Sequence, residues 1–127
     1  MLNIVISLTS SEPIYEQIKN QIKQQILLGF IKPGDALPSI RMLAKELNVS
    51  VITTKRAYEE LEKEGFVITT PAKGTFVAEI DREKLSSLGL QEIENDLKAA
   101  VKKAKTLGVD LQSLLQIIEK LYKGDEL

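Results

Sequence analysis

Apolar residues recur at helical spacing in several stretches of this 127-residue chain. The first stretch lies between Pro13 and Gly29, and an isoleucine stands at every fourth position of it: Ile14, Ile18, Ile22 and Ile26. Because residues four apart share one face of a helix, this pattern predicts an amphipathic helix. Pro13 suits its first turn and Gly29 its end. Before it, apolar and polar residues alternate over 2–8, which predicts a short strand.

Two shorter helices are predicted next, joined by a tight turn. Ser39 suits the N-cap of the first, and Asn48, which tolerates the left-handed conformation, suits its end. Ser50 suits the N-cap of the second helix, over residues 51–64, which Gly65 ends. Its inner face carries four residues at helical spacing: Thr54, Ala57, Tyr58 and Leu61.

A β-hairpin is predicted after the second of these helices. Residues 66–70 and 75–80 are rich in β-branched and aromatic side chains, and Pro71-Ala72-Lys73-Gly74 lies between them as a turn. A helix-turn-helix followed by a hairpin is a winged helix, and the usual role of a winged helix is to read duplex DNA. The sequence therefore predicts a recognition helix at 51–64 and a wing at 66–80.

The last 47 residues, from Asp81 on, are predicted to form two amphipathic helices. Gly108 separates them, and Asp110 suits the N-cap of the second. The helical hairpin needs a surface that buries its apolar stripe, and a second copy of the chain would bury most of it. The residues expected to form this dimer interface are Leu90, Ile93, Leu97, Val101, Leu111, Leu114, Leu115, Ile118, Leu121 and Tyr122. Packing of the tail within one subunit is the alternative.

The predicted fold class is therefore α+β, with a winged helix-turn-helix DNA-binding domain at 1–80 and a helical dimerisation region at 81–127. The net charge of −1 argues mildly against a DNA-binding protein. Its distribution matters more, since residues 39–58 carry four cations and one carboxylate, whereas 59–64 carry four carboxylates and one cation. Positive charge is therefore concentrated where contact with phosphates is expected.

Other function classes find little support in the composition. The chain has no Cys and no His, which excludes disulfides and thiolate metal sites and argues against an enzyme. It has no glycine-rich phosphate loop, so we expect no cofactor. No apolar run reaches the roughly 20 residues of a membrane span, and no basic region precedes the apolar N-terminal residues. We therefore expect a cytoplasmic protein without a membrane partner.

Several segments, spread in order over residues 12–79, resemble the N-terminal domain of GntR-family transcription regulators. They are 13–18, 29–41, 43–49, 56–65 and 73–77. The short two-helix tail resembles the YtrA-type branch of that family. The resemblance implies DNA contacts at Ser39, Arg41, Ser50, Thr53, Lys55, Lys73 and Gly74, and helical geometry adds Arg56. Val51 and Ile52 depart from the polar or basic residues of many relatives, and Ala72 stands where many have Gly.

The function predicted is a sequence-specific DNA-binding transcriptional regulator, a repressor that binds palindromic operator DNA as a homodimer. A winged-helix module that binds a protein instead of DNA is the alternative, in which case the Lys55-Arg56 pair is an ordinary solvated surface. Forty-seven helical residues can hardly enclose a pocket of about 300 Å³ within one subunit. A small-molecule effector, which the sequence does not identify, would then bind at the dimer interface.

Overall fold

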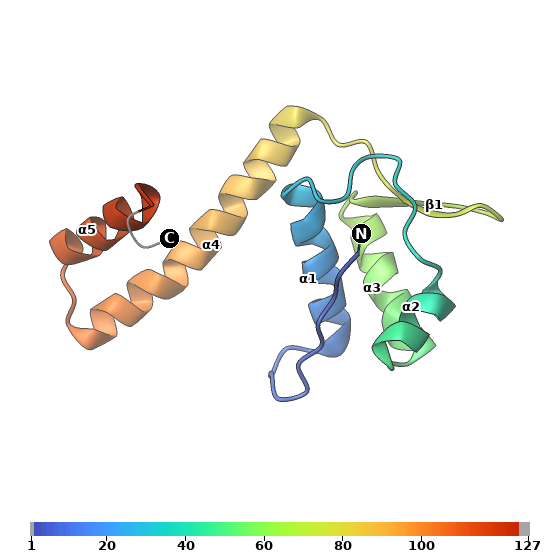
Figure 1. The fold of residues 1–127 in the computed structure, drawn as a ribbon, viewed down its shortest axis with the longest axis horizontal. Helices are drawn as coiled ribbons and strands as arrows, with labels where there is room; N and C mark the ends of the chain where they lie inside the picture. The colour runs from blue at the N-terminus through green and yellow to red at the C-terminus, as the bar shows by residue number, and fades with distance from the viewer. Residues whose placement is uncertain (1, 125–127) are drawn as a thin grey trace. The chain divides into compact units, whose positions relative to one another are not determined.

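The fold is α+β, as the sequence predicts (Figure 1). A computed structural model describes residues 2–124. The elements, in chain order, are α1 (Ile14–Leu27), α2 (Ile40–Leu47), α3 (Val51–Lys63), β1 (Val67–Thr70), β2 (Gly74–Val77), α4 (Arg82–Leu107) and α5 (Leu111–Tyr122). The chain divides after Leu85 into two units, each described by itself below.

Polar caps fix the turn between α2 and α3. The Ser39 Oγ accepts a hydrogen bond from the Met42 amide at 3.1 Å, and the Ser50 Oγ accepts one from the Thr53 amide at 3.0 Å. Asn48 has the left-handed φ of 57° that ends α2. The three predicted roles are therefore confirmed, and together they set the direction in which α3 leaves α2.

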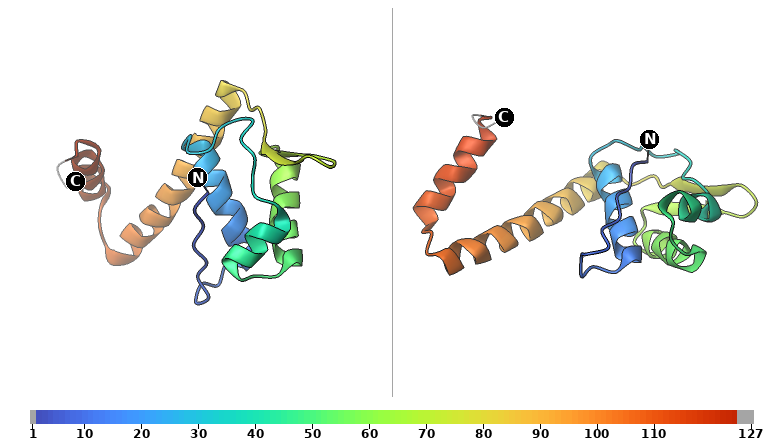
Figure 2. Two further views of the ribbon diagram at one scale, coloured as in Figure 1. Left: turned by 45° about the vertical axis from the view of Figure 1, so that its right-hand side comes forward. Right: turned by 60° about the horizontal axis from the view of Figure 1, so that its bottom comes forward.

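The three helices of the first unit pack around one apolar core, and Figure 2 shows them from two further sides. Its largest fully buried side chains include Phe66, Ile18, Ile22, Leu61 and Val67. Tyr58 is buried with them, and its hydroxyl donates a hydrogen bond to the Pro38 carbonyl at 2.7 Å. Burial, with a smaller effect of Glu46, raises the pKa of Tyr58, so this hydroxyl remains a neutral donor.

The wing is shorter than predicted. Its strands pair antiparallel from Val67 opposite Val77 to Thr70 opposite Gly74, so β2 ends at Val77 rather than at residue 80. Its other edge is covered by residues 34–37, whose Leu37 amide donates to the Thr75 carbonyl at 2.8 Å. The predicted second strand was too long because β-branched composition extends beyond the residues that find a backbone partner.

The predicted strand at residues 2–8 is wrong. The structure has no strand there, because the extended backbone pairs with side chains instead of with another strand. Three glutamines at four-residue intervals on α1 bond to the backbone of every second residue: Gln25 to Asn3, Gln21 to Val5 and Gln17 to Ser7. A primary amide offers the same donor and acceptor as a peptide group, so these side chains take the place of a neighbouring strand.

We expect Gln17→Leu to lower the free energy of unfolding by about 1–3 kcal/mol, since it leaves partly buried backbone groups without partners. The Gln17 amide, 5% exposed, bonds to the Ser7 amide and carbonyl and to the Glu12 carbonyl. Urea denaturation measures the change. Gln21→Leu is the matched control and should cost less, because its bonds to Val5 are exposed. Equal losses in both variants would contradict this account.

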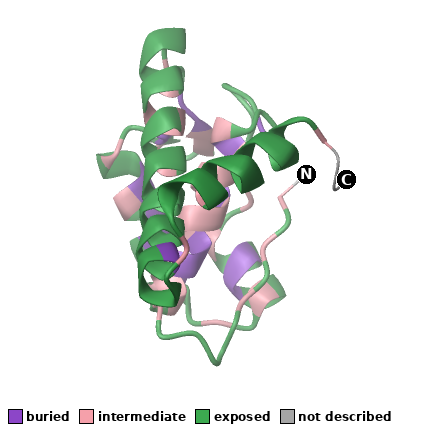
Figure 3. Ribbon diagram, turned by 90° about the vertical axis from the view of Figure 1, so that its left-hand side faces the viewer, coloured by how far each residue is buried: buried purple, intermediate pink, exposed green. Residues whose placement is uncertain are grey.

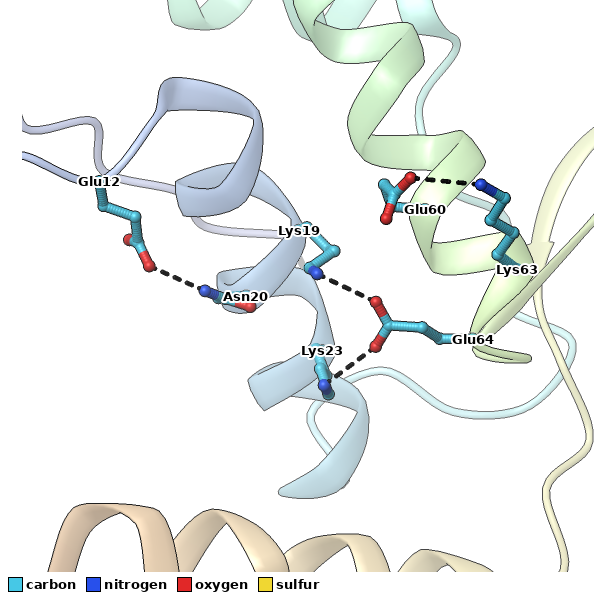
Figure 4. A network of polar contacts seen from close by, with 7 residues as sticks. All are labelled: Glu12, Lys19, Asn20, Lys23, Glu60, Lys63 and Glu64. Atoms are coloured by element: carbon cyan, nitrogen blue, oxygen red, sulfur yellow. Dashed lines mark hydrogen bonds and ion pairs between the residues drawn. The ribbon is translucent and has the colours of Figure 1, made fainter. Parts of the chain in front are cut away.

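An ion-pair network joins α1 to the end of α3 (Figure 4). The Glu64 carboxylate lies 3.0 Å from the Lys19 Nζ and 3.1 Å from the Lys23 Nζ. Burial alone would favour the neutral acid, but hydrogen bonds from the two lysines outweigh it and hold the pKa of Glu64 below its ordinary 4.5. The hydrogen bond to Glu64, against a smaller effect of burial, raises the pKa of Lys19.

A pH dependence of stability follows from this network. Folding lowers the pKa of Glu64, so its ionised carboxylate stabilises the folded protein above pH 4.5. This stabilisation is lost as the pH falls through the lower pKa that Glu64 has in the folded state. We expect Glu64→Gln to cost about 1 kcal/mol of unfolding free energy at pH 7, and about nothing near pH 3. Denaturation of both proteins across this range measures it. Glu94→Gln, which removes an exposed carboxylate 3.9 Å from Lys98, should show no such difference.

The second unit contains the part of α4 that follows Leu85, and the whole of α5. Asp110 caps α5, since its Oδ1 accepts a hydrogen bond from the Ser113 amide at 2.9 Å, and this bond lowers the pKa of Asp110. Figure 3 shows α5 exposed along nearly its whole length, although one side of it is apolar. Within residues 2–124, no helix is both long and apolar enough to cross a membrane.

Candidate nucleic-acid interface

The exposed face of α3 centres on an apolar side chain. At 3.6 residues per turn, the buried residues Thr54, Ala57 and Leu61 mark one side of the helix, and Ile52 lies opposite them. Ile52 is 81% exposed and Val51 is 43% exposed. Neither side chain supports the core, so both are available for contact with a partner. In a DNA groove, such apolar groups fit the thymine methyl.

Two cations lie on opposite sides of this face. Lys55 is exposed and lies on the side of α3 that faces α2. Tyr58 marks this side, because its hydroxyl bonds to the Pro38 carbonyl just before α2. Arg56 lies toward α1, where its guanidinium carbon is 3.8 Å from the centre of the Tyr15 ring. The two neighbours in sequence therefore reach in different directions, and the packing of α3 decides which element each of them faces.

The N-terminal end of α3 carries two hydroxyl groups already bonded to each other. The Ser50 Oγ donates to the Thr53 Oγ1 at 2.7 Å while accepting from the Thr53 amide. Ser50 therefore has its donor engaged, whereas within residues 2–124 the Thr53 hydroxyl hydrogen has no acceptor and can bond to a group such as a phosphate oxygen. Ser39 and Arg41 lie at the start of α2, both exposed, and the Ser39 Oγ accepts the capping bond from the Met42 amide.

The tip of the wing is set by backbone conformation. Ala72 has a φ of 67° and Gly74 a φ of 116°, and both Lys73 and Gly74 are exposed. A Cβ added to Gly74 would meet no atom within 4 Å, so there is space for a side chain. Glycine is favoured here because of the positive φ. Ala72 adopts the left-handed conformation at a cost of about 1 kcal/mol. The wing starts just after α3, at the end of that helix farthest from Ser50 and about 20 Å along its axis.

Sequence reasoning missed four residues that form or brace this surface. Tyr15 was not among the predicted contact residues, but its ring lies against Arg56. The Gln17 and Gln21 side chains and the Glu64 carboxylate were not singled out, although they tie the N-terminal segment and α3 to α1. The repeat of glutamine at four-residue intervals was the one available signal. Within residues 2–124, no three His, Cys, Asp or Glu side chains gather as metal ligands would.

The class of protein follows from these observations. A helix-turn-helix with an exposed second helix that carries cations, followed by a hairpin wing, is a DNA-binding winged helix. Residues 14–77 match the model of the bacterial regulatory proteins of the gntR family. The chain belongs to this GntR family and is a DNA-binding transcription regulator.

Relatives of known name or structure agree with this assignment. The HTH-type transcriptional repressor YtrA of Bacillus subtilis strain 168 is 39% identical over 118 residues, which are 93% of this chain and 91% of that protein. A GntR family transcriptional regulator from Listeria monocytogenes has a similar structure, with a TM-score of 0.77, 29% identity, and coverage of 89% of this chain and 98% of that one. The DNA-binding domain of AraR, solved in complex with operator ORX1, is similar with a TM-score of 0.54 and 30% identity, over 61% of this chain and 96% of that one.

Proposed function

We propose that the protein is a repressor that binds a palindromic operator as a homodimer, with α3 in the major groove and the wing in the minor groove. The observation that carries the proposal is the apolar stripe of the second unit, which that unit by itself leaves exposed. Its exposed members include Leu90, Ile93, Leu97, Val101, Leu111, Leu115, Ile118, Leu121 and Tyr122, and Leu114 is half-buried. An exposed apolar stripe of this extent indicates a protein partner.

A second copy is the partner that we propose. An isologous interface buries the same stripe on both subunits and places two recognition helices on one duplex. Their half-sites would be about 34 Å apart, or a multiple of that, so that the operator has two-fold symmetry. Each subunit would contact it through the predicted set: Ser39, Arg41, Ser50, Thr53, Lys55, Arg56, Lys73 and Gly74.

Repression by steric block is the mode of action that we propose, because a dimer of this size bound at a promoter excludes RNA polymerase without further machinery. The name of the YtrA relative supports repression in that protein. The protein would act in the cytoplasm and by binding rather than by catalysis. A small-molecule effector, if one exists, would bind between the two subunits.

The test is a titration of the full chain against two duplexes of equal length, one from its own upstream region and one of random sequence. We expect the upstream duplex to bind at least roughly 10³-fold more tightly near physiological salt, with both affinities falling as salt rises. A symmetric footprint would support the dimer. Equal, weak binding to both duplexes, together with unchanged binding by Lys55→Ala, would instead favour a winged helix that binds a protein.

A further inference from the structure

The contact between Tyr15 and Arg56 joins α1 to the exposed face of α3. The Arg56 guanidinium carbon is 3.8 Å from the ring centre, which is the distance of a stacked cation–π pair. The helices α1 and α3 run parallel at this point. Tyr15 and Arg56 are separated by 41 residues, as are Lys23 and Glu64 at the other end of the pair. The stack therefore lies near the middle of α3, closer to Ser50 than the Lys23–Glu64 pair does.

Stacking leaves the hydrogen-bonding edge of Arg56 free. A guanidinium is planar and its N–H groups point outward in the plane, so a ring on one face engages none of them. Among residues 2–124, no carboxylate pairs with Arg56, and Glu60, one turn further along, lies 3.8 Å from Lys63. The donors of Arg56 are thus held in one orientation by the ring and remain available to an anion.

Arg56 and Lys55 flank Ile52 on the two sides of the exposed face. The major groove is bordered by two phosphate backbones, so cations on opposite sides of a recognition helix reach opposite strands. We infer that Tyr15 is a positioning residue for DNA binding, whose ring holds the Arg56 guanidinium with its edge toward a phosphate of the strand on the α1 side. This inference rests on the proposed mode of DNA binding.

The physical reason is preorganisation. A free arginine side chain samples many rotamers and loses them when it binds a phosphate, which weakens the contact. The Tyr15 ring restricts Arg56 before DNA arrives, so less freedom is lost on binding. The rotamer freedom saved on one such side chain corresponds to roughly three- to fivefold in affinity. Phosphate contacts carry no sequence information, so the affinity for the operator and the affinity for the random duplex should increase by the same factor.

A purely structural role for the stack makes different predictions. If Tyr15 only joined α1 to α3, its loss would lower stability and act on DNA affinity independently of Arg56. If it positions Arg56, its loss has no effect once Arg56 is gone, since two groups that act as one contact are not additive. A third possibility is that the Tyr15 hydroxyl itself contacts DNA. The ring and the hydroxyl are separable by substitution.

The experiment uses the full chain with a double-mutant cycle on the upstream duplex and the random duplex of equal length. The variants are Tyr15→Met, which keeps the bulk without the ring, Tyr15→Phe, which keeps the ring without the hydroxyl, Arg56→Ala and the Tyr15→Met/Arg56→Ala double variant. The readouts are the dissociation constant and its slope against salt concentration. We expect Arg56→Ala to lower the magnitude of the slope by about 1.

Tyr15→Met should weaken binding to both duplexes by roughly three- to fivefold and shift the slope toward that of Arg56→Ala. Tyr15→Phe should bind as the wild type, and the double variant should bind no more weakly than Arg56→Ala. Additive losses in the double variant, or a loss in Tyr15→Phe equal to that in Tyr15→Met, would overturn the inference.

If Tyr15→Met fails to fold, Arg56→Lys replaces it, because lysine keeps the charge without the flat face. Arg56→Lys should then bind roughly three- to fivefold more weakly than the wild type, and equal binding would overturn the inference.

Failure of the proposed function is distinguishable from failure of this inference. If wild-type protein does not prefer the upstream duplex, the operator-binding proposal fails there, whereas the slopes on the random duplex still report whether Tyr15 acts through Arg56. If the wild type does prefer the upstream duplex and Tyr15→Met is unchanged in affinity and slope, the inference alone fails.

Discussion

Leu115→Lys is expected to convert the proposed homodimer to a monomer and to abolish tight operator binding. Leu115 is 49% exposed in the single chain and lies on the apolar side of α5 beside Ile118. In a two-fold interface each substitution occurs twice, so the loss of two buried leucine side chains costs about 3–6 kcal/mol, and two buried ammonium groups add to it. Such a change raises the dissociation constant of the dimer by at least ~10³.

The measurement is sedimentation or light scattering over a range of protein concentrations, together with the operator titration. Gln116→Lys is the matched control, because it introduces the same charge at the next position of α5, on the polar side of the helix. It should leave the dimer and DNA binding unchanged. A Leu115→Lys protein that remains dimeric would show that the subunits associate elsewhere, and dissociation of Gln116→Lys would show a general effect on α5.

The double variant Lys55→Ala/Arg56→Ala is expected to lose operator binding, by roughly 10² to 10³-fold, with the fold and the dimer intact. Both side chains are exposed on α3 and neither is part of the buried core. If each neutralises one phosphate, the slope of affinity against salt concentration should fall in magnitude by about 2. A titration at several salt concentrations measures both quantities.

The control for this variant is Lys63→Ala/Lys84→Ala, which removes the same charge at the other end of α3. Lys63 occupies the last position of the helix, and the Lys84 Nζ lies near Gly65 just after it. If DNA binding depended only on net charge, both double variants would weaken it equally. Full operator binding by Lys55→Ala/Arg56→Ala would contradict a groove-reading role for α3 and would favour the protein-binding alternative.

Most of the fold was predictable because the signals are local. Side-chain oxygens of Ser39 and Ser50 cap their helices in the structure as short-range rules require, and Asn48 takes the left-handed conformation. The predicted strand at 2–8 failed for the opposite reason. Alternation shows that one face is apolar, but it does not show whether another strand or the side chains of a helix supply the hydrogen bonds.

The places of the candidate residues on α2, α3 and the wing were predictable, whereas the directions of their side chains were less so. Lys55 and Arg56 are neighbours in sequence, so a pattern treats them as one basic pair, whereas a helix turns about 100° between them and gives them different surroundings. Tyr15 stands in α1, 41 residues before Arg56, and nothing local to either residue indicates their contact. The stripe of α5 was predicted from periodicity, and the structure adds that the second unit, taken by itself, leaves it exposed.

The sequence by itself determined the order of the helices, the wing and the family, because periodicity, caps and turn residues act over a few positions. Only the tertiary structure decided that Gln17 and Gln21 hold an extended segment, that Glu64 joins two lysines of α1, and that Arg56 stacks on Tyr15. These contacts depend on how α1 packs against the rest of the first unit. Packing is set by the whole core at once, so no single stretch of sequence contains it.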